Sequence, residues 1–249
     1  MLVFGKRNMK ELIRDPLSYI FCLGFPIVML LIFTVINDSI PSEAKPDIFR
    51  IDRLSGGIAV FGLTFVMLFS ALLISQDRTT AFLTRLYAAP MKAWEFIGGY
   101  YLPILLLSVS QAVITFGASF IIAAGENISM SIGRAFLAIL CLIPTAVMFT
   151  GFGLLFGCLF GTNAAPGLCS VIISAAGILG GVWLDVDALD GGFRNVCLVL
   201  PFYHSVRAVQ SVMTGNSDNF AADMLVVCAY MLAAFLLSAA AFRRNMNKN

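Results

Sequence analysis

The 249-residue chain is 59% hydrophobic and only 12% charged, and its mean hydropathy is +0.92. A typical soluble domain is about 25% charged, so this composition excludes an ordinary soluble enzyme. The formal net charge of +2 gives no sign of a polyanionic partner, and we expect no nucleic acid.

All charged residues lie outside five uncharged runs. An apolar helix needs about 20 residues to cross the hydrocarbon core of a bilayer. Four runs supply one crossing each, and the run from Ala135 to Leu184 supplies two, because Asn163 and Pro166 favour a turn in its middle. We therefore predict an all-α integral membrane protein with a single transmembrane domain, 1–249, built as a six-transmembrane-helix bundle. The expected crossings are 17–37, 56–76, 97–124, 135–160, 165–184 and 223–242.

The charges between the runs divide unevenly over the two sides of this bundle. One side has ten basic and four acidic residues, and the other has six basic and ten acidic residues. The basic side is cytoplasmic by the positive-inside rule. We therefore expect a multi-pass protein of the plasma membrane with both termini in the cytoplasm.

Residues 1–15 precede the first crossing and interleave apolar with basic side chains. This pattern favours an N-terminal amphipathic helix at the inner membrane interface, and a frayed basic tail is the alternative. The apolar members of the pattern are Leu2, Val3, Met9, Leu12 and Ile13.

The longest cytoplasmic connection is the loop 77–95, between the second and third crossings. Within it Phe82, Arg85 and Leu86 fall at helical spacing, and Pro90 can end the helix. A short helix with Phe82 and Leu86 on one face fits a groove on a partner protein. The alternative, which we weigh equally, is that this face packs beneath the protein's own bundle.

The third and fourth crossings each carry a pattern on one helical face. The third has polar residues that could line a substrate path or form hydrogen bonds between helices. They are Ser108, Gln111, Thr115 and Ser119. The fourth has glycines that allow close backbone approach, either within one subunit or at a subunit interface. They are Gly153, Gly157 and Gly161.

Between the last two crossings, the 12 residues 195–206 carry no charge, which is too short for a crossing and typical of a re-entrant segment. We expect the outer segment 187–207 to dip into the outer leaflet, with a break or kink at Pro201. His204 has no carboxylate neighbour in the sequence, so a catalytic role is not favoured. Arg207 is expected to anchor the segment at the outer interface, where its head group reaches water.

The sequence contains no motif for catalysis, metal binding or ATP hydrolysis. The six cysteines have neither metal-ligand spacing nor a disulfide framework, and we expect no catalytic residue and no metal. The sequence Gly-x-x-x-x-Gly-Lys-Ser/Thr is missing, so this chain should bind no cofactor and hydrolyse no ATP. The uncharged crossings disfavour ion-coupled carriers. A passive channel or another ATP-independent transporter is the alternative function.

Two stretches resemble signatures of the ABC-2 type permeases, which are membrane subunits of ABC exporters of the drug-resistance kind. The first is Asp77-Arg78-Thr79-Thr80-Ala81-Phe82-Leu83-Thr84-Arg85-Leu86-Tyr87-Ala88-Ala89-Pro90. It departs from the family where Ala81-Phe82 replaces the usual Gly-Thr. The second comprises Gly180-Gly181, the acidic stretch from Asp185 to Asp190, Leu200-Pro201-Phe202-Tyr203-His204 and Arg207.

The resemblance covers essentially the whole chain. It implies a permease that works with a second permease, identical or not, and with two ATPase subunits that hold ATP and Mg. It also implies a connecting helix at the N-terminus, a coupling helix in 77–95 and a re-entrant outer element that includes Pro201, Tyr203, His204 and Arg207. The expected cargo is a hydrophobic or amphipathic compound, such as a drug, an antimicrobial peptide or a lipid-linked molecule. The coupling residues implied are Asp77, Arg78, Phe82, Arg85, Leu86, Tyr87 and Pro90.

Overall fold

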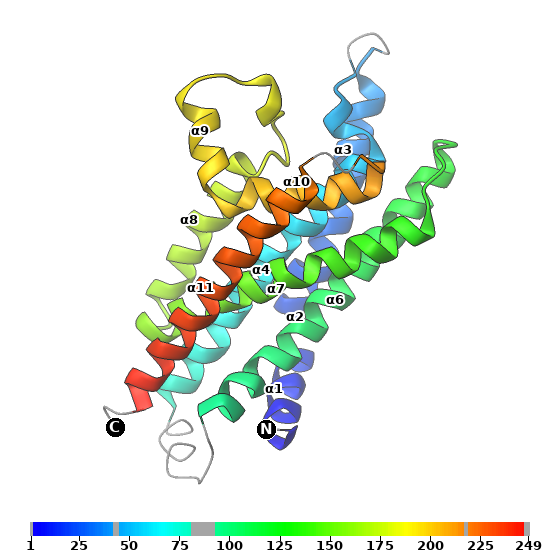
Figure 1. Ribbon diagram of the computed structural model, residues 1–249. Helices are drawn as coiled ribbons and strands as arrows, with labels where there is room; N and C mark the ends of the chain where they lie inside the picture. The colour runs from blue at the N-terminus through cyan, green and yellow to red at the C-terminus, as the bar shows by residue number, and fades with distance from the viewer. Residues whose placement is uncertain (1, 42–44, 81–92, 217–218, 247–249) are drawn as a thin grey trace.

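The computed structural model describes residues 2–41, 45–80, 93–216 and 219–246. These ranges form helices and short connections and contain no strand. Figure 1 shows the long helices running side by side between two ends of the bundle. Both chain termini lie at one end, and helices α9 and α10 lie at the other (Figure 1).

The chain begins with α1 (Leu2–Arg14), which packs along α6. Asp15 then adopts an extended conformation, and its side chain accepts a hydrogen bond from the backbone N–H of Leu17. Asp15 therefore caps the N-terminus of a new helix, which is separate from α1. The first crossing therefore begins afresh at Pro16 and runs to Ser39.

The first crossing combines α2 (Pro16–Tyr19), a π-helical turn (Ile20–Gly24) and α3 (Phe25–Ser39). In the π-helical turn the N–H of Phe25 bonds to the carbonyl of Ile20, five residues earlier. The crossing packs against α4 and α6. Only 17% of its most apolar window is buried, so most of its surface is available to lipid or to another subunit.

Helix α4 (Ile51–Thr79) is the centre of the bundle. It contacts α3, α6, α7, α8 and α10, and 89% of its most apolar window is buried. Its glycines and small side chains let several neighbours approach at once. A helix that is apolar on every side and covered on every side is a core helix, and the other crossings are arranged around it.

The remaining long helices are α6 (Ala93–Gly125), α7 (Ile132–Leu159), α8 (Ala164–Leu179) and α11 (Phe220–Met246). The first three pack against α4, and α11 packs on α7 and α10. Short 3₁₀ turns at Asp47–Phe49 and Val186–Ala188 lie in the connections before α4 and before α9.

Two helices close the end of the bundle opposite the termini. They are α9 (Gly192–Val199) and α10 (Pro201–Thr214), which meet at an angle of 78°. At 1.5 Å per residue they are about 12 and 21 Å long, so neither crosses a hydrocarbon core of about 30 Å. The chain breaks between them at Leu200, which is extended and precedes Pro201.

The structure confirms an all-α membrane bundle but shortens one predicted crossing. Five helical stretches in the described part of the chain are long and apolar enough to span a membrane, or six if α9 and α10 are counted as one broken span. The predicted crossing 165–184 is helical only over Ala164–Leu179, about 24 Å. It ends there because Gly180 and Gly181 follow, and Gly181 has φ +72°, a conformation that suits glycine.

Two of the three glycines predicted on the fourth crossing bring α7 against α4. A Cβ added at Gly153 would lie 2.6 Å from the Cβ of Ser70, and one added at Gly157 would lie 2.6 Å from the carbonyl oxygen of Ala71. Gly161 lies beyond the end of α7, and a Cβ there would meet nothing within 4 Å. Gly153 and Gly157 therefore pack within one subunit, and Gly161 takes no part in that contact.

We expect Gly157→Ala to destabilise the protein by about 1–3 kcal/mol, because the extra methyl group overpacks the α4–α7 contact. Gly161→Ala is the matched control and should leave stability unchanged. The measurement is thermal unfolding of both variants purified in the same mild detergent. Equal melting temperatures for the two variants would show that the close α4–α7 approach does not exist in solution.

Candidate functional site

Three helices meet at one buried carboxylate, at the end of the bundle where the chain termini lie (Figure 1). Asp77, in the last turns of α4, is only 3% exposed in spite of its charge. The guanidinium of Arg7 on α1 donates hydrogen bonds to its two oxygens at 2.8 and 2.7 Å. The hydroxyl of Tyr100 on α6 donates another at 2.8 Å. We call this group the Asp77 cluster.

Neighbouring contacts fix α1 on α6 beside the cluster. Asn8 is fully buried and donates from Nδ2 to the carbonyl of Gly99 at 3.0 Å. The ring of Phe4 packs edge-on against Tyr100 with centroids 4.9 Å apart, in space that any side chain at position 99 would fill. Glu11 pairs with Arg7, but burial raises the pKa of the Glu11 carboxyl. Helix α1 is thus docked onto the bundle.

Arg78 makes a second connection from the same turn of α4. Its Nη1 donates to the carbonyls of Gly157 at 2.9 Å and Phe160 at 3.2 Å. These carbonyls lie at the C-terminal end of α7, where backbone acceptors lack helical partners and a cation is favourable. The end of α4 is therefore bonded to α1, α6 and α7.

This geometry changes the interpretation of two predicted coupling residues. Asp77 is turned inward, away from any partner protein, and Arg78 is bonded to α7. Both connect the start of the loop 77–95 to the bundle. The other predicted coupling residues, Phe82, Arg85, Leu86, Tyr87 and Pro90, lie outside the described residues.

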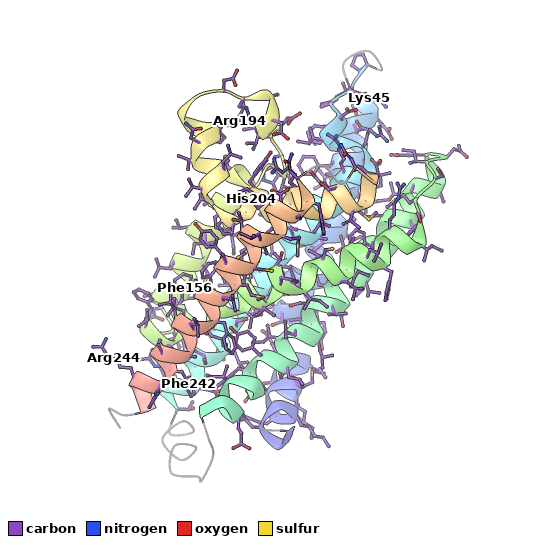
Figure 2. All side chains as sticks on the ribbon, in the orientation of Figure 1. Lys45, Phe156, Arg194, His204, Phe242 and Arg244 are labelled. Atoms are coloured by element: carbon purple, nitrogen blue, oxygen red, sulfur yellow. The ribbon has the colours of Figure 1, made fainter. Side chains whose placement is uncertain are left out.

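A second buried carboxylate lies at the opposite end of the bundle. Asp223, in the first turn of α11, has no exposed surface. Arg207 on α10 donates to it from Nε at 2.7 Å and from Nη2 at 2.6 Å. The Nδ1 atom of His204, which Figure 2 marks on α10, lies 2.6 Å from the same carboxylate. We call this group the Asp223 cluster.

His204 has an acceptor at each ring nitrogen. Its Nε2 lies 2.9 Å from the carbonyl oxygen of Leu198 on α9, while Nδ1 faces Asp223. A neutral imidazole can donate from only one nitrogen, so both bonds are satisfied only by the imidazolium. In agreement, the hydrogen bond to Asp223 raises the pKa of His204 although burial opposes this.

Further hydrogen bonds connect the helices around this cluster. Tyr203 donates to Asp187, and Arg207 donates to the Tyr203 hydroxyl at 3.1 Å. Tyr230 on α11 donates to the carbonyl of Val199 at 2.9 Å. The guanidinium of Arg207 binds Asp223, and a quarter of its side chain remains exposed. Its expected role as an anchor at the membrane interface stays a prediction.

Sequence reasoning did not find the Asp223 cluster, because its members are brought together by folding. Asp223 is 19 residues from His204 and belongs to another helix. The available signal was an acidic residue at the first turn of an otherwise apolar crossing. Such a position is favourable for a carboxylate because the helix N-terminus carries partial positive charge.

The polar stripe of the third crossing lies inside the bundle. Ser108, Gln111, Thr115 and Ser119 are at most 2% exposed. Ser108, Thr115 and Ser119 donate to carbonyls of their own helix, and Gln111 donates to the carbonyl of Ala59 on α4 at 3.4 Å. The stripe is therefore closed against α4 and does not line an open path in this structure.

The described residues contain no group of three or more His, Cys, Asp or Glu side chains that could hold a metal ion. The two clusters bind helix to helix, and in each of them donors from other helices satisfy a carboxylate. Such an arrangement positions helices and does not activate a nucleophile or a water molecule. The geometry is therefore that of a membrane protein whose two ends are held by buried charge.

Comparison with known proteins gives the family. The sequence model of the ABC-2 type transporter family matches residues 1–214. The chain belongs to this family. It is 22% identical over 235 residues to YvfS of Bacillus subtilis (strain 168), which is named as a transport permease, and the match covers 93% of this chain and 92% of that protein. It is 28% identical over 78 residues to nodulation protein J of Rhizobium meliloti (strain 1021), or 31% and 30% of the two chains.

Membership confirms the family resemblance of the two signatures. This ABC-2 family member is a multi-pass membrane protein and a transport permease, not an enzyme. Its family generally works with an ABC ATPase. The residues matched by the family model include the Asp77 cluster and the α9–α10 corner, and they end just before α11.

We expect the stability of this permease to fall as the pH rises above about 6.5. His204 binds its proton more tightly in the folded protein than in the unfolded chain, where the pKa is about 6.5. Its stabilising contribution is complete below that value and is lost as the pH rises through the folded-state pKa. Thermal unfolding between pH 6 and pH 9 measures this loss.

The matched comparison is His204→Gln, which keeps a donor for one of the two acceptors and does not titrate. Its melting temperature should depend less on pH than that of the unmodified protein. Identical pH profiles for the two proteins would show that His204 does not carry the proton between Asp223 and Leu198.

Proposed function

We propose that this permease is the membrane subunit of an ABC exporter in the plasma membrane. It works with a second permease chain, identical or related, and with two separate ATPase subunits that hold ATP and Mg. The observation that carries the proposal is the attachment of the α4 end to three other helices by Asp77 and Arg78, at the start of the loop 77–95. Family membership supports the ATPase partner.

The orientation follows from the charges at the two ends of the bundle. Figure 2 marks Arg244 near the end with the termini, and Lys45 and Arg194 near the other end. Lys6, Lys10 and Arg243 are exposed at the same end as Arg244. We assign this basic end to the cytoplasm. The loop 77–95 then faces the compartment in which ATP is available.

In this mechanism, ATP binding closes the two ATPases and moves the loop 77–95 with them. The movement enters the permease at the end of α4. Asp77 transmits it to α1 and α6, and Arg78 transmits it to the end of α7. ATP shifts the transporter between inward and outward arrangements only if the two arrangements bind ATP with different affinity.

The cargo that we propose is a hydrophobic or amphipathic compound, because the crossings contain no charged residue in their interiors. A passive channel gains no support from the described residues, since the polar stripe that could have lined a pore is packed against α4.

The partner is tested by purifying the permease from its native membrane in a gentle detergent and identifying stoichiometric partners by mass spectrometry. We expect one P-loop ATPase per permease chain. If an active preparation reproducibly lacks such an ATPase, the exporter assignment is wrong and a passive channel becomes the better interpretation.

Coupling is tested with Asp77→Asn, which removes the charge that holds Arg7 and should loosen α1 from α4. In vesicles that contain the complete complex, we expect transport per ATP hydrolysed to fall about tenfold, while ATP hydrolysis continues. Arg7→Gln should reproduce the defect from the other side of the pair, and Gln76→Ala, an exposed neighbour, is the control. Normal transport by both cluster variants, in correctly inserted protein, would refute a role for the Asp77 cluster in coupling.

A further inference from the structure

An apolar groove opens on the outside of the bundle, between the cytoplasmic halves of α6 and α11. Its volume is about 600 Å³. Small residues leave it unfilled, namely Gly98 on α6 and Ala239 and Ala240 on α11. Tyr101 and Phe235, whose ring centroids are 5.4 Å apart, close the other end.

Arg243 lies at the mouth of this groove, in the last turn of α11. Its side chain is exposed, and among the described residues no carboxylate pairs with it. None of the described residues that line the groove is acidic. In the described part of the chain, the groove therefore combines an apolar body with the positive charge of Arg243 at its cytoplasmic edge.

This combination lies at a defined depth in the membrane. The apolar part faces the hydrocarbon of one leaflet, and Arg243 lies where α11 leaves the hydrocarbon, at the level of the headgroups. A ligand that fits must have an apolar chain and an anionic head at its end. The cytoplasmic leaflet supplies such molecules, because it is rich in anionic lipids.

We propose that the groove between α6 and α11 is a binding site for an anionic phospholipid of the inner leaflet, with an acyl chain along Gly98, Ala239 and Ala240 and the phosphate on Arg243. The assignment to the inner leaflet rests on the orientation given under the proposed function. The preference for an anionic lipid does not depend on that orientation, because it follows from the apolar groove and Arg243 alone. The site is separate from both carboxylate clusters.

The test uses the full-length permease, purified without any ATPase, stripped of lipid and offered phosphatidylglycerol or phosphatidylcholine with identical acyl chains. Bound lipid is counted by native mass spectrometry. We expect retention of phosphatidylglycerol in preference to phosphatidylcholine. Arg243→Gln should weaken phosphatidylglycerol binding about fivefold, the equivalent of about 1 kcal/mol for one basic residue at an anionic surface, and should leave phosphatidylcholine binding unchanged.

Two further variants separate the groove from general surface charge. Arg244→Gln removes the neighbouring exposed charge, which does not line the groove, and should have no effect. Ala240→Phe fills the groove from an exposed position and should abolish the preferential retention of phosphatidylglycerol, with an unchanged melting temperature.

An equal loss for the two arginine variants, or undiminished binding to Ala240→Phe, would overturn the proposal. Equal binding of the two lipids by the unmodified protein would also overturn it. Because the measurement needs neither ATP nor a partner, its failure would leave the exporter function untouched. If the permease binds the lipid but has no ATPase partner, the lipid site stands and the exporter function is refuted.

Discussion

A carboxylate removed from water is tolerated only when other groups satisfy it, and this constraint shapes both ends of the permease. Asp77 and Asp223 are almost completely buried; Asp77 receives donors from α1 and α6, and Asp223 is bonded to two side chains of α10. Breaking such a buried pair by removing one partner costs about 3–5 kcal/mol. Between the two ends, the helices are held by apolar packing around α4. The bundle is thus held by the Asp77 and Asp223 clusters at its ends and by close packing of helices in its middle.

Helices α4 and α7 are held together both by close packing and by hydrogen bonds. Gly153 and Gly157 leave no free space between α4 and α7, and Arg78 adds hydrogen bonds at the end of that contact. The two helices are therefore expected to move as one body. The first crossing and α11 are far less covered, with 17% and 22% of their windows buried. Rearrangements during transport are most easily accommodated on that less covered side.

Hydrophobicity alone predicted most of the fold, because lipid accepts no charge and the uncharged runs mark the crossings directly. It could not tell the central helix from the peripheral ones, since α4 and the first crossing are both apolar throughout. It also overestimated α8, because the uncharged run continues through Gly180 and Gly181 although the helix stops. The candidate site was predicted only in part. Asp77 was identified by its place in a loop signature, but its burial and its partner Arg7, 70 residues away, depend on tertiary packing.

The corner between α9 and α10 has a consequence for where it can lie in the membrane. A broken helix normally leaves carbonyl oxygens that only water can satisfy. Here His204 satisfies the carbonyl of Leu198, and Tyr230 satisfies that of Val199. Two of the acceptors freed by the break therefore already have protein donors. Burial of this corner in the apolar part of a membrane therefore costs less than burial of an ordinary helix end, whose last carbonyls have no protein donor.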